Sequence, residues 1–345
     1  MKIVKTFFQN IKPLLHKITL SLLLAALTYN STKAQFSIDE KTWLERMNLQ
    51  AGLPDKLLST RTVAFYDYTL TEKEILDMQQ SFQRSGVDAV AYFELDMLMA
   101  GKDITRAFGD YLTKREVTNL LFVQKDEGGF RIVATAYNGK ETVIDDQQPA
   151  WSRSNSNLNE ALKELYRASS SQRKQNLLIN EAPETGLKVN PVQGNRNEFY
   201  AIDLKVDPLA VPKTGDEATD KELEEIFKMY YPLKYKMTEA GTPEKELRKQ
   251  GLLYVVCFVH TRGVIAKDLL GYDMSKSESA LVSVTYPDNQ QQLKNIGSNT
   301  PVYKFYFKHI DSGNVFFGTK WDADLTWQQA LINQLKGMKA ELRLN

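Results

Sequence analysis

The sequence predicts an α/β protein with mixed sheets, built from two tandem copies of a β-α-β-α-β-β-β-α module. Apolar runs of strand length alternate with amphipathic helical stretches, and this order occurs twice. The stretches RSGVDAVAYF and RKQGLLYVVCF also resemble each other, since each has basic residues, a glycine and an apolar strand with an aromatic end. Downstream, Gly101 and Gly109 match Gly263 and Gly271 at the same spacing.

The elements of the first module can be expected in order. TVAFYDY predicts a strand, and Thr71 with Glu74 forms a capping box that begins a helix ending at Gly86. VDAVAYFEL is apolar nearly throughout, as a strand buried on both faces should be. A helix in ITRAFGDYL and strands in NLLFVQ and FRIVATAY follow. The turn Asn138-Gly139 then leads to a strand in ETVI and a closing helix.

The second module is expected to begin at NEFYAIDLKV. It carries a charged helical insert at residues 216–250, in which Pro232 ends one helix and Pro243 begins another. Its stretch GNVFFGTK is one transposition away from the phosphate-loop pattern G-x-x-x-x-G-K-[ST]. Because Val315, Phe316 and Phe317 fill the centre of that stretch, it predicts a strand instead of a phosphate loop.

The chain is thus expected to contain five successive parts. They are a signal peptide (1–34), an N-terminal helical segment (35–60), the first module (61–168), a linker (169–197) and the second module (198–345).

The N-terminus predicts export. Basic residues without an acid precede the apolar run ITLSLLLAALT, and Thr32 and Ala34 are small residues suited to cleavage after Ala34. Removing residues 1–34 would take away five lysines and no acid, leaving 39 basic against 43 acidic residues. We therefore expect an exported protein in the periplasm of a Gram-negative bacterium, with association with the outer membrane left open. We expect no transmembrane segment after signal removal and no nucleic-acid partner.

Histidine and cysteine offer little for catalysis. The single cysteine, Cys257, lies in the apolar run LLYVVCFV, where burial disfavours its thiolate. Apart from His16 in the signal peptide, the histidines are His260 and His309, and neither has a second His or Cys at ligand spacing. The sequence predicts no catalytic residue, no cofactor and no metal site.

Acids at strand ends are the candidate ligand-binding residues. Ligands of α/β sheets gather beyond the carboxyl ends of parallel strands, where polar side chains close the predicted strands of both modules. These candidates are Asp67, Glu94 and Asp96 in the first module and Asp203, His260 and Arg262 in the second.

The stretch KMYYPLKYKM is the candidate surface for a protein partner. It interleaves lysines with tyrosines inside the insert that breaks the symmetry of the repeat. The residues in question are Tyr230, Tyr231, Lys234, Tyr235 and Lys236.

This order of elements resembles the N-terminal domain of the TolB protein and the periplasmic domain of the CsgG family. The resemblance implies a non-enzymatic module of envelope machinery. We expect a non-catalytic binding or scaffold protein that contacts an envelope protein. The alternatives are a periplasmic hydrolase using Asp67, Glu94 and Asp96, or a small-ligand sensor with its site between the copies.

Overall fold

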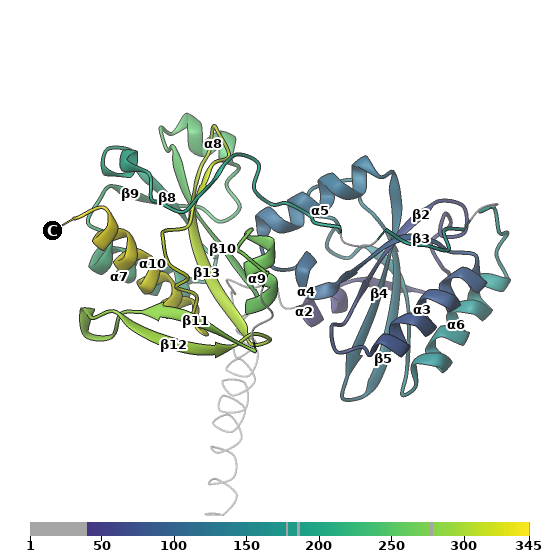
Figure 1. The fold of residues 1–345 in the computed structure, drawn as a ribbon. Coiled ribbons are helices and arrows are strands. Elements are labelled where there is room, and N and C mark those ends of the chain that lie inside the picture. Colours follow the sequence, from purple (N-terminus) through teal and green to yellow (C-terminus); the bar gives the residue numbers. More distant parts are fainter. Residues whose placement is uncertain (1–39, 177–178, 185–186, 276–278, 345) are drawn as a thin grey trace, which may run out of the picture.

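The computed structural model describes residues 40–176, 179–184, 187–275 and 279–344. Two α/β halves lie side by side, and each is built on a sheet that mixes parallel and antiparallel strands (Figure 1). The predicted fold class is thereby confirmed. The expected signal peptide and its cleavage site lie outside the described residues.

The first half is a sheet with helices on both faces. Within the described residues its six strands follow the spatial order β1-β6-β5-β4-β2-β3. The strands are β1 (Asn48–Gln50), β2 (Arg61–Tyr66), β3 (Asp88–Glu94), β4 (Val117–Asp126), β5 (Gly129–Ala136) and β6 (Pro149–Asn155). The helices are α2 (Glu40–Glu45), α3 (Glu72–Ser85), α4 (Leu95–Leu98), α5 (Lys102–Lys114) and α6 (Leu158–Ser170).

Helix α3 shows how local sequence sets these elements. The Thr71 side chain accepts from the Glu74 backbone N–H, the Glu74 side chain accepts from the Thr71 backbone N–H, and Gly86 closes the helix at φ 90°. The predicted capping box and C-cap glycine are therefore confirmed. Helices α3 and α6 bury their apolar sides together on one face of the sheet, and α5 covers the other face.

The second half repeats this plan with additions. Its strands are β7 (Arg196–Asn197), β8 (Leu209–Pro212), β9 (Tyr235–Thr238), β10 (Tyr254–Arg262), β11 (Ala280–Thr285), β12 (Gln292–Gly297), β13 (Pro301–His309) and β14 (Val315–Phe316). Its helices are α7 (Glu217–Tyr230), α8 (Glu244–Lys249), α9 (Gly263–Leu269) and α10 (Trp327–Glu341), with short 3₁₀ turns η1 (Ile202–Lys205) and η2 (Pro287–Asn289). The strand predicted in GNVFFGTK is present as β14, and α10 begins only at Trp327, so the stretch lacks the loop-to-helix geometry of a phosphate site.

The two sheets have the same strand order. In the described part of the second half it is β7-β14-β13-β10-β8-β9, which equals the first order when strands are counted along the chain without β11 and β12. Parallel and antiparallel pairings also follow in the same sequence across both sheets. That the halves are copies of one ancestral unit stays a prediction.

The register of the predicted repeat is wrong by one strand. The similarity of RSGVDAVAYF to RKQGLLYVVCF placed β3 on β10, but β10 lies between β8 and β13, which is the place of β4 in the first sheet. Residues 216–250 are consequently no insert, because they hold α7, β9 and α8, the counterparts of α3, β3 and α5. Within the described residues of the second half, α9 and the β11–β12 hairpin have no counterpart in the first half. The positions of Pro232 and Pro243 agree with prediction, since α7 ends at Tyr230 and α8 begins at Glu244.

One predicted strand is wrong, and the start of the second module differs from expectation. ETVI forms a turn in which Val143 has φ 66°, and its apolar side chains are buried under α5. Residues Pro149–Asn155 provide the third strand of the meander instead. NEFYAIDLKV, where the second module was expected to begin, contains the 3₁₀ turn η1, in which Leu204 is buried.

The domain boundaries also shift slightly. The N-terminal helix ends at Glu45, and β1 then pairs with β6, so the predicted N-terminal segment belongs to the first half. The linker likewise ends in β7, which pairs with β14. Before that strand the linker is held by both halves, because Arg106 of α5 donates to the Pro191 carbonyl at 3.1 Å and Gly194 donates to the Gly313 carbonyl at 3.1 Å.

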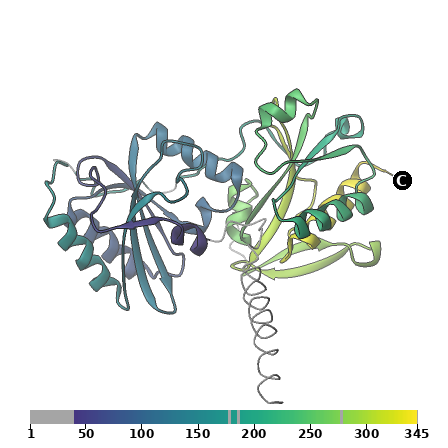
Figure 2. The ribbon, with the colours of Figure 1, turned by 180° about the vertical axis from the view of Figure 1, so that it is seen from behind.

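The two halves share a hydrophobic core. A single cluster of buried side chains joins Phe65, Phe93 and Phe108 of the first half to Val259 and Tyr306 of the second. Seen from behind, the two halves again lie side by side (Figure 2). In the part of the chain that the structure describes, no helix is long and apolar enough to cross a membrane.

Candidate functional site

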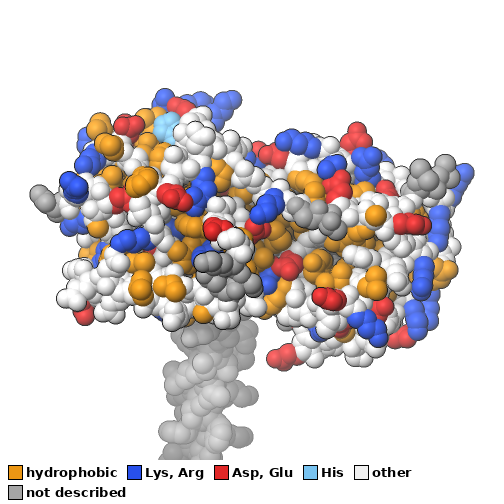
Figure 3. All heavy atoms as spheres, viewed as in Figure 1, with side chains coloured by type: hydrophobic (Ala, Val, Ile, Leu, Met, Phe, Trp, Pro, Cys, Tyr) orange, Lys and Arg blue, Asp and Glu red, His pale blue; other side chains and the backbone are white. Residues whose placement is uncertain are grey.

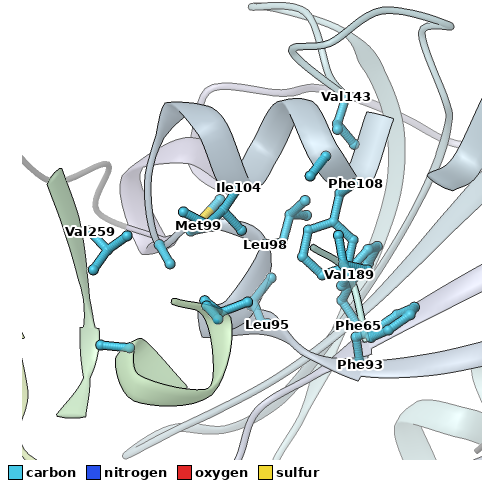
Figure 4. Close-up of a cluster of buried hydrophobic side chains, with 14 of the residues drawn as sticks. Phe65, Phe93, Leu95, Leu98, Met99, Ile104, Phe108, Val143, Val189 and Val259 are labelled. Atoms are coloured by element: carbon cyan, nitrogen blue, oxygen red, sulfur yellow. The ribbon is translucent and has the colours of Figure 1, made fainter. Parts of the chain in front are cut away.

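The candidate site lies at the junction, where α4 and α5 of the first half approach β10 and β13 of the second. The His260 backbone N–H donates to the Ala100 carbonyl at 2.7 Å. A Cβ on Gly101 would lie 2.7 Å from the Phe258 carbonyl oxygen, so glycine allows this close approach. Met99 and Ile104 face Val259 across the junction (Figure 4).

Three of the predicted site residues meet here, and they pair with one another. Arg262 at the end of β10 donates through Nε to Asp96 Oδ2 at 2.6 Å, and its Nη2 donates to Glu94 and to Asp96 Oδ1. Thr261 also donates to Asp96, at 3.1 Å. The guanidinium carbon lies 3.9 Å from the centre of the Tyr68 ring. Glu94, Asp96 and Arg262 were expected at strand ends of two different modules. They instead form one ion cluster between the halves.

The other predicted ligand residues do not join this cluster as side chains. Asp67 accepts from the backbone and hydroxyl of Thr69 in a local turn. Asp203 lies in η1, so its expected place at a strand end is wrong. The His260 ring stacks on Tyr303 at 3.8 Å, and burial lowers its pKa, which favours the neutral form.

The predicted partner surface is only partly a surface. Tyr231 is buried in the core of the second half, where its ring contacts Phe227 and Tyr235. Tyr230 and Tyr235 are partly buried, and only Lys234 and Lys236 are exposed. Tyr231 packs in this way because α7 is a structural helix of the sheet, with buried residues on its inner side.

A second ion cluster at the junction is not among the sequence-predicted sites. Buried Lys308 on β13 donates to Asp103 Oδ1 at 2.6 Å, and its Nζ lies 2.5 Å from Glu244. The Tyr306 hydroxyl donates to Asp103 Oδ2 at 2.9 Å. Although burial alone would raise it, Lys308 and Arg106 hold the pKa of Asp103 below its usual value.

The sequence did contain a signal for this cluster. In YKFYFKH, Lys304 and Lys308 occupy the same alternating positions as Val302 and Tyr306, which are buried. A lysine that faces inward from a core strand requires a buried acceptor. The sequence around Asp103, the partner of Lys308, has no comparable pattern. Asp103 lies in the other half, so the pairing depends on how the halves pack.

A pocket of about 450 Å³ adjoins the second cluster. Both halves line it, with Met99 and Asp103 on one side and Val255, Cys257 and Lys308 on the other. Most of the wall is apolar, and a few polar groups converge on it, as is usual in small-molecule sites between domains. Burial raises the pKa of the Cys257 thiol, so the thiolate is scarce at neutral pH.

Each acid of the two junction clusters has a basic partner: Arg262 pairs with Glu94 and Asp96, and Lys308 pairs with Asp103 and Glu244. Among the described residues, no group of three or more His, Cys, Asp and Glu side chains converges as a metal site would. On the face shown in Figure 3, charges of both signs are interspersed.

No protein-family model matches the chain, and no curated protein matches its sequence.

Proposed function

We propose that the protein is a non-catalytic binding protein, in which the two halves form one body and a small ligand occupies the pocket between them. The observation that carries this proposal is the pocket of about 450 Å³ with walls from both halves. The pairing of Glu94 and Asp96 with Arg262 weighs against the hydrolase alternative. The basic and apolar N-terminus supports export to the periplasm as part of the same proposal.

The wall of the pocket suits an amphipathic molecule with an apolar body. Val211, Val255 and Phe258 contribute apolar surface, while Lys308 and Thr214 contribute polar groups. Lys308 already has two acid partners, so the pocket has no strong preference for an anion.

Cys257 provides a direct test, because it is the only cysteine and it lines the pocket. We expect 1-anilinonaphthalene-8-sulfonate, an amphipathic probe, to fluoresce on binding and to slow maleimide labelling of Cys257 at pH 8.5. Thr242→Trp, at the partly exposed edge of the pocket, should abolish both effects. Lys245→Trp on the same segment, exposed and outside the pocket, should retain them. Probe fluorescence without protection of Cys257 would contradict the proposal.

A scaffold function through a protein partner is the second candidate. It is favoured by three large apolar side chains that are close in sequence and exposed, Phe199 at 67%, Ile202 at 73% and Val206 at 72%. A pull-down from crosslinked cell envelopes tests it, read by mass spectrometry. A stoichiometric envelope protein captured by the wild type and lost with Phe199→Ser/Ile202→Ser would support it, provided that Val282→Ser retains the capture. A variant lacking residues 216–250 would be a poor control for this capture. Helix α7 in that range carries core residues, so the deletion would disturb the fold of the second half.

A further inference from the structure

A smaller pocket lies within the second half, apart from the junction. It has a volume of about 230 Å³ and lies between α10, the loop after β14 and the residues before η1. Its wall includes Tyr200, Tyr286, Asp322, Gly337 and Glu341.

Gly337 is the first indication that this space is kept open. It lies inside α10, where glycine is less favourable than alanine by about 1 kcal/mol. A Cβ there would meet nothing closer than the Tyr286 hydroxyl at 3.6 Å, Asp322 Oδ2 at 3.8 Å and the Tyr200 hydroxyl at 3.9 Å. These are ordinary contact distances, so packing does not require a glycine. What the glycine preserves is the space between three oxygen atoms.

Asp322 presents one carboxylate oxygen to this space. The residue is 3% exposed, and its Oδ1 accepts from the buried Lys304 at 2.6 Å. Lys304 also donates to the Phe317 carbonyl at 3.0 Å and to Gln334 Oε1 at 2.6 Å, so all three of its N–H donors have acceptors. Oδ2 is left as the oxygen that borders Gly337.

Two acids, Asp322 and Glu341, and one lysine, Lys320, lie in the wall of the pocket. Burial raises the pKa of both Tyr200 and Tyr286, and the negative charges of Asp322 and Glu341 raise these pKa values further. Glu341 itself accepts from the Tyr200 backbone N–H at 2.7 Å and from the Thr319 backbone N–H at 3.2 Å. The cation at the rim, Lys320, is hydrogen-bonded to Gln291.

We propose that this pocket binds the primary ammonium group of a small organic amine. An ammonium group has three N–H donors, and Asp322 Oδ2 and the hydroxyls of Tyr200 and Tyr286 provide three acceptors around one point. The site is independent of the function proposed for the junction pocket.

The test uses methylammonium chloride as the probe and the melting temperature of the purified protein as the readout, at constant ionic strength set with NaCl. The melting temperature of the wild type should rise and saturate with methylammonium, because the ligand binds the folded state. Tetramethylammonium, which has no N–H to donate, should give no rise.

Gly337→Ala is the decisive variant, because it places a methyl group between the three oxygens without a close contact. It should melt at or above the wild-type temperature in the absence of ligand and should bind methylammonium at least tenfold more weakly. Lys339→Ala, exposed on the same helix, should bind as the wild type does. No rise in the wild type at 100 mM methylammonium, or an equal rise in Gly337→Ala, would overturn the proposal.

Discussion

Strands β5 and β13 occupy the same place in the two sheets, yet their buried residues differ. The core residues of β5 include Ile132, Val133 and Ala134, all apolar. In β13, Lys304 is fully buried and Lys308 is 3% exposed. The first sheet shows that a strand at this place in the sheet needs no buried charge for the sheet to form. Since buried ion pairs are rarely more stabilising than apolar residues of the same size, stability alone does not account for the lysines of β13.

Lys308→Met, which brings β13 closer to the apolar character of β5, should have the largest effect. It leaves Asp103 buried with Arg106 at 3.7 Å as its remaining cation. Removing one partner of a buried pair typically lowers the free energy of unfolding by about 3–5 kcal/mol. Urea unfolding followed by tryptophan fluorescence would measure the loss.

The matched control is the double variant Asp103→Leu/Lys308→Met. Because it removes both charges, it should recover most of the lost free energy of unfolding. If the loss in the double variant equals the sum of the losses in Lys308→Met and Asp103→Leu, the two residues are not energetically coupled. The contrast between β5 and β13 would then not reflect a stabilising ion pair.

The pH dependence of Asp103→Asn comes next in size. At neutral pH the substitution should lower the free energy of unfolding by about 2–3 kcal/mol, because Lys308 loses a charged acceptor. The folded-state pKa of Asp103 is lowered from 3.8, so the wild-type advantage is fully present above that value. It should disappear as the pH falls through the lowered pKa and the native carboxylate gains a proton. An advantage that is unchanged from pH 7 to pH 2 would rule out an ionised Asp103 as its source.

Local patterns in the sequence predicted the elements better than their assembly. The capping box at Thr71 and Glu74 identified α3 within a residue, because a cap depends on neighbours in the chain. The strand order did not follow from similarity between RSGVDAVAYF and RKQGLLYVVCF, because an edge strand and a central strand can have the same apolar pattern.

The candidate site was partly predictable for the same reason. Glu94, Asp96 and Arg262 were selected as polar ends of strands, which is a local property. That the acids and the arginine face one another depends on how the halves pack, and no pattern within either half encodes it. Asp103 and Asp322 were missed, since nothing near them in sequence reveals the lysines that hold them.

Arg262→Gln tests the comparison between the two sheets at the ends of β10 and β4. Strand β4, the counterpart of β10, ends at Asp126, whose side chain accepts from the Gly128 backbone N–H in a local turn. Strand β10 ends instead in the cluster of Arg262 with Glu94 and Asp96. Loss of the arginine should lower the free energy of unfolding by about 1.5 kcal/mol, because Glu94 is partly exposed and can be rehydrated. Urea unfolding would measure it, with Arg153→Gln on β6 as an exposed control. An effect no larger than that of the control would mean that this cluster does not stabilise the junction.

Thr71→Ala should have the smallest effect and tests whether the halves unfold as one body. Losing the cap of α3 should lower the free energy of unfolding by about 1 kcal/mol, and Thr71→Ser should restore it. The damage is confined to the first half, but the hydrophobic core continues across the junction from Phe108 to Tyr306. Hydrogen exchange at urea concentrations below the unfolding transition should therefore show earlier opening in β13 as well as in α3. Earlier opening of the first half alone would show that the shared core does not couple the halves, and the junction pocket would then lie between two bodies that unfold separately.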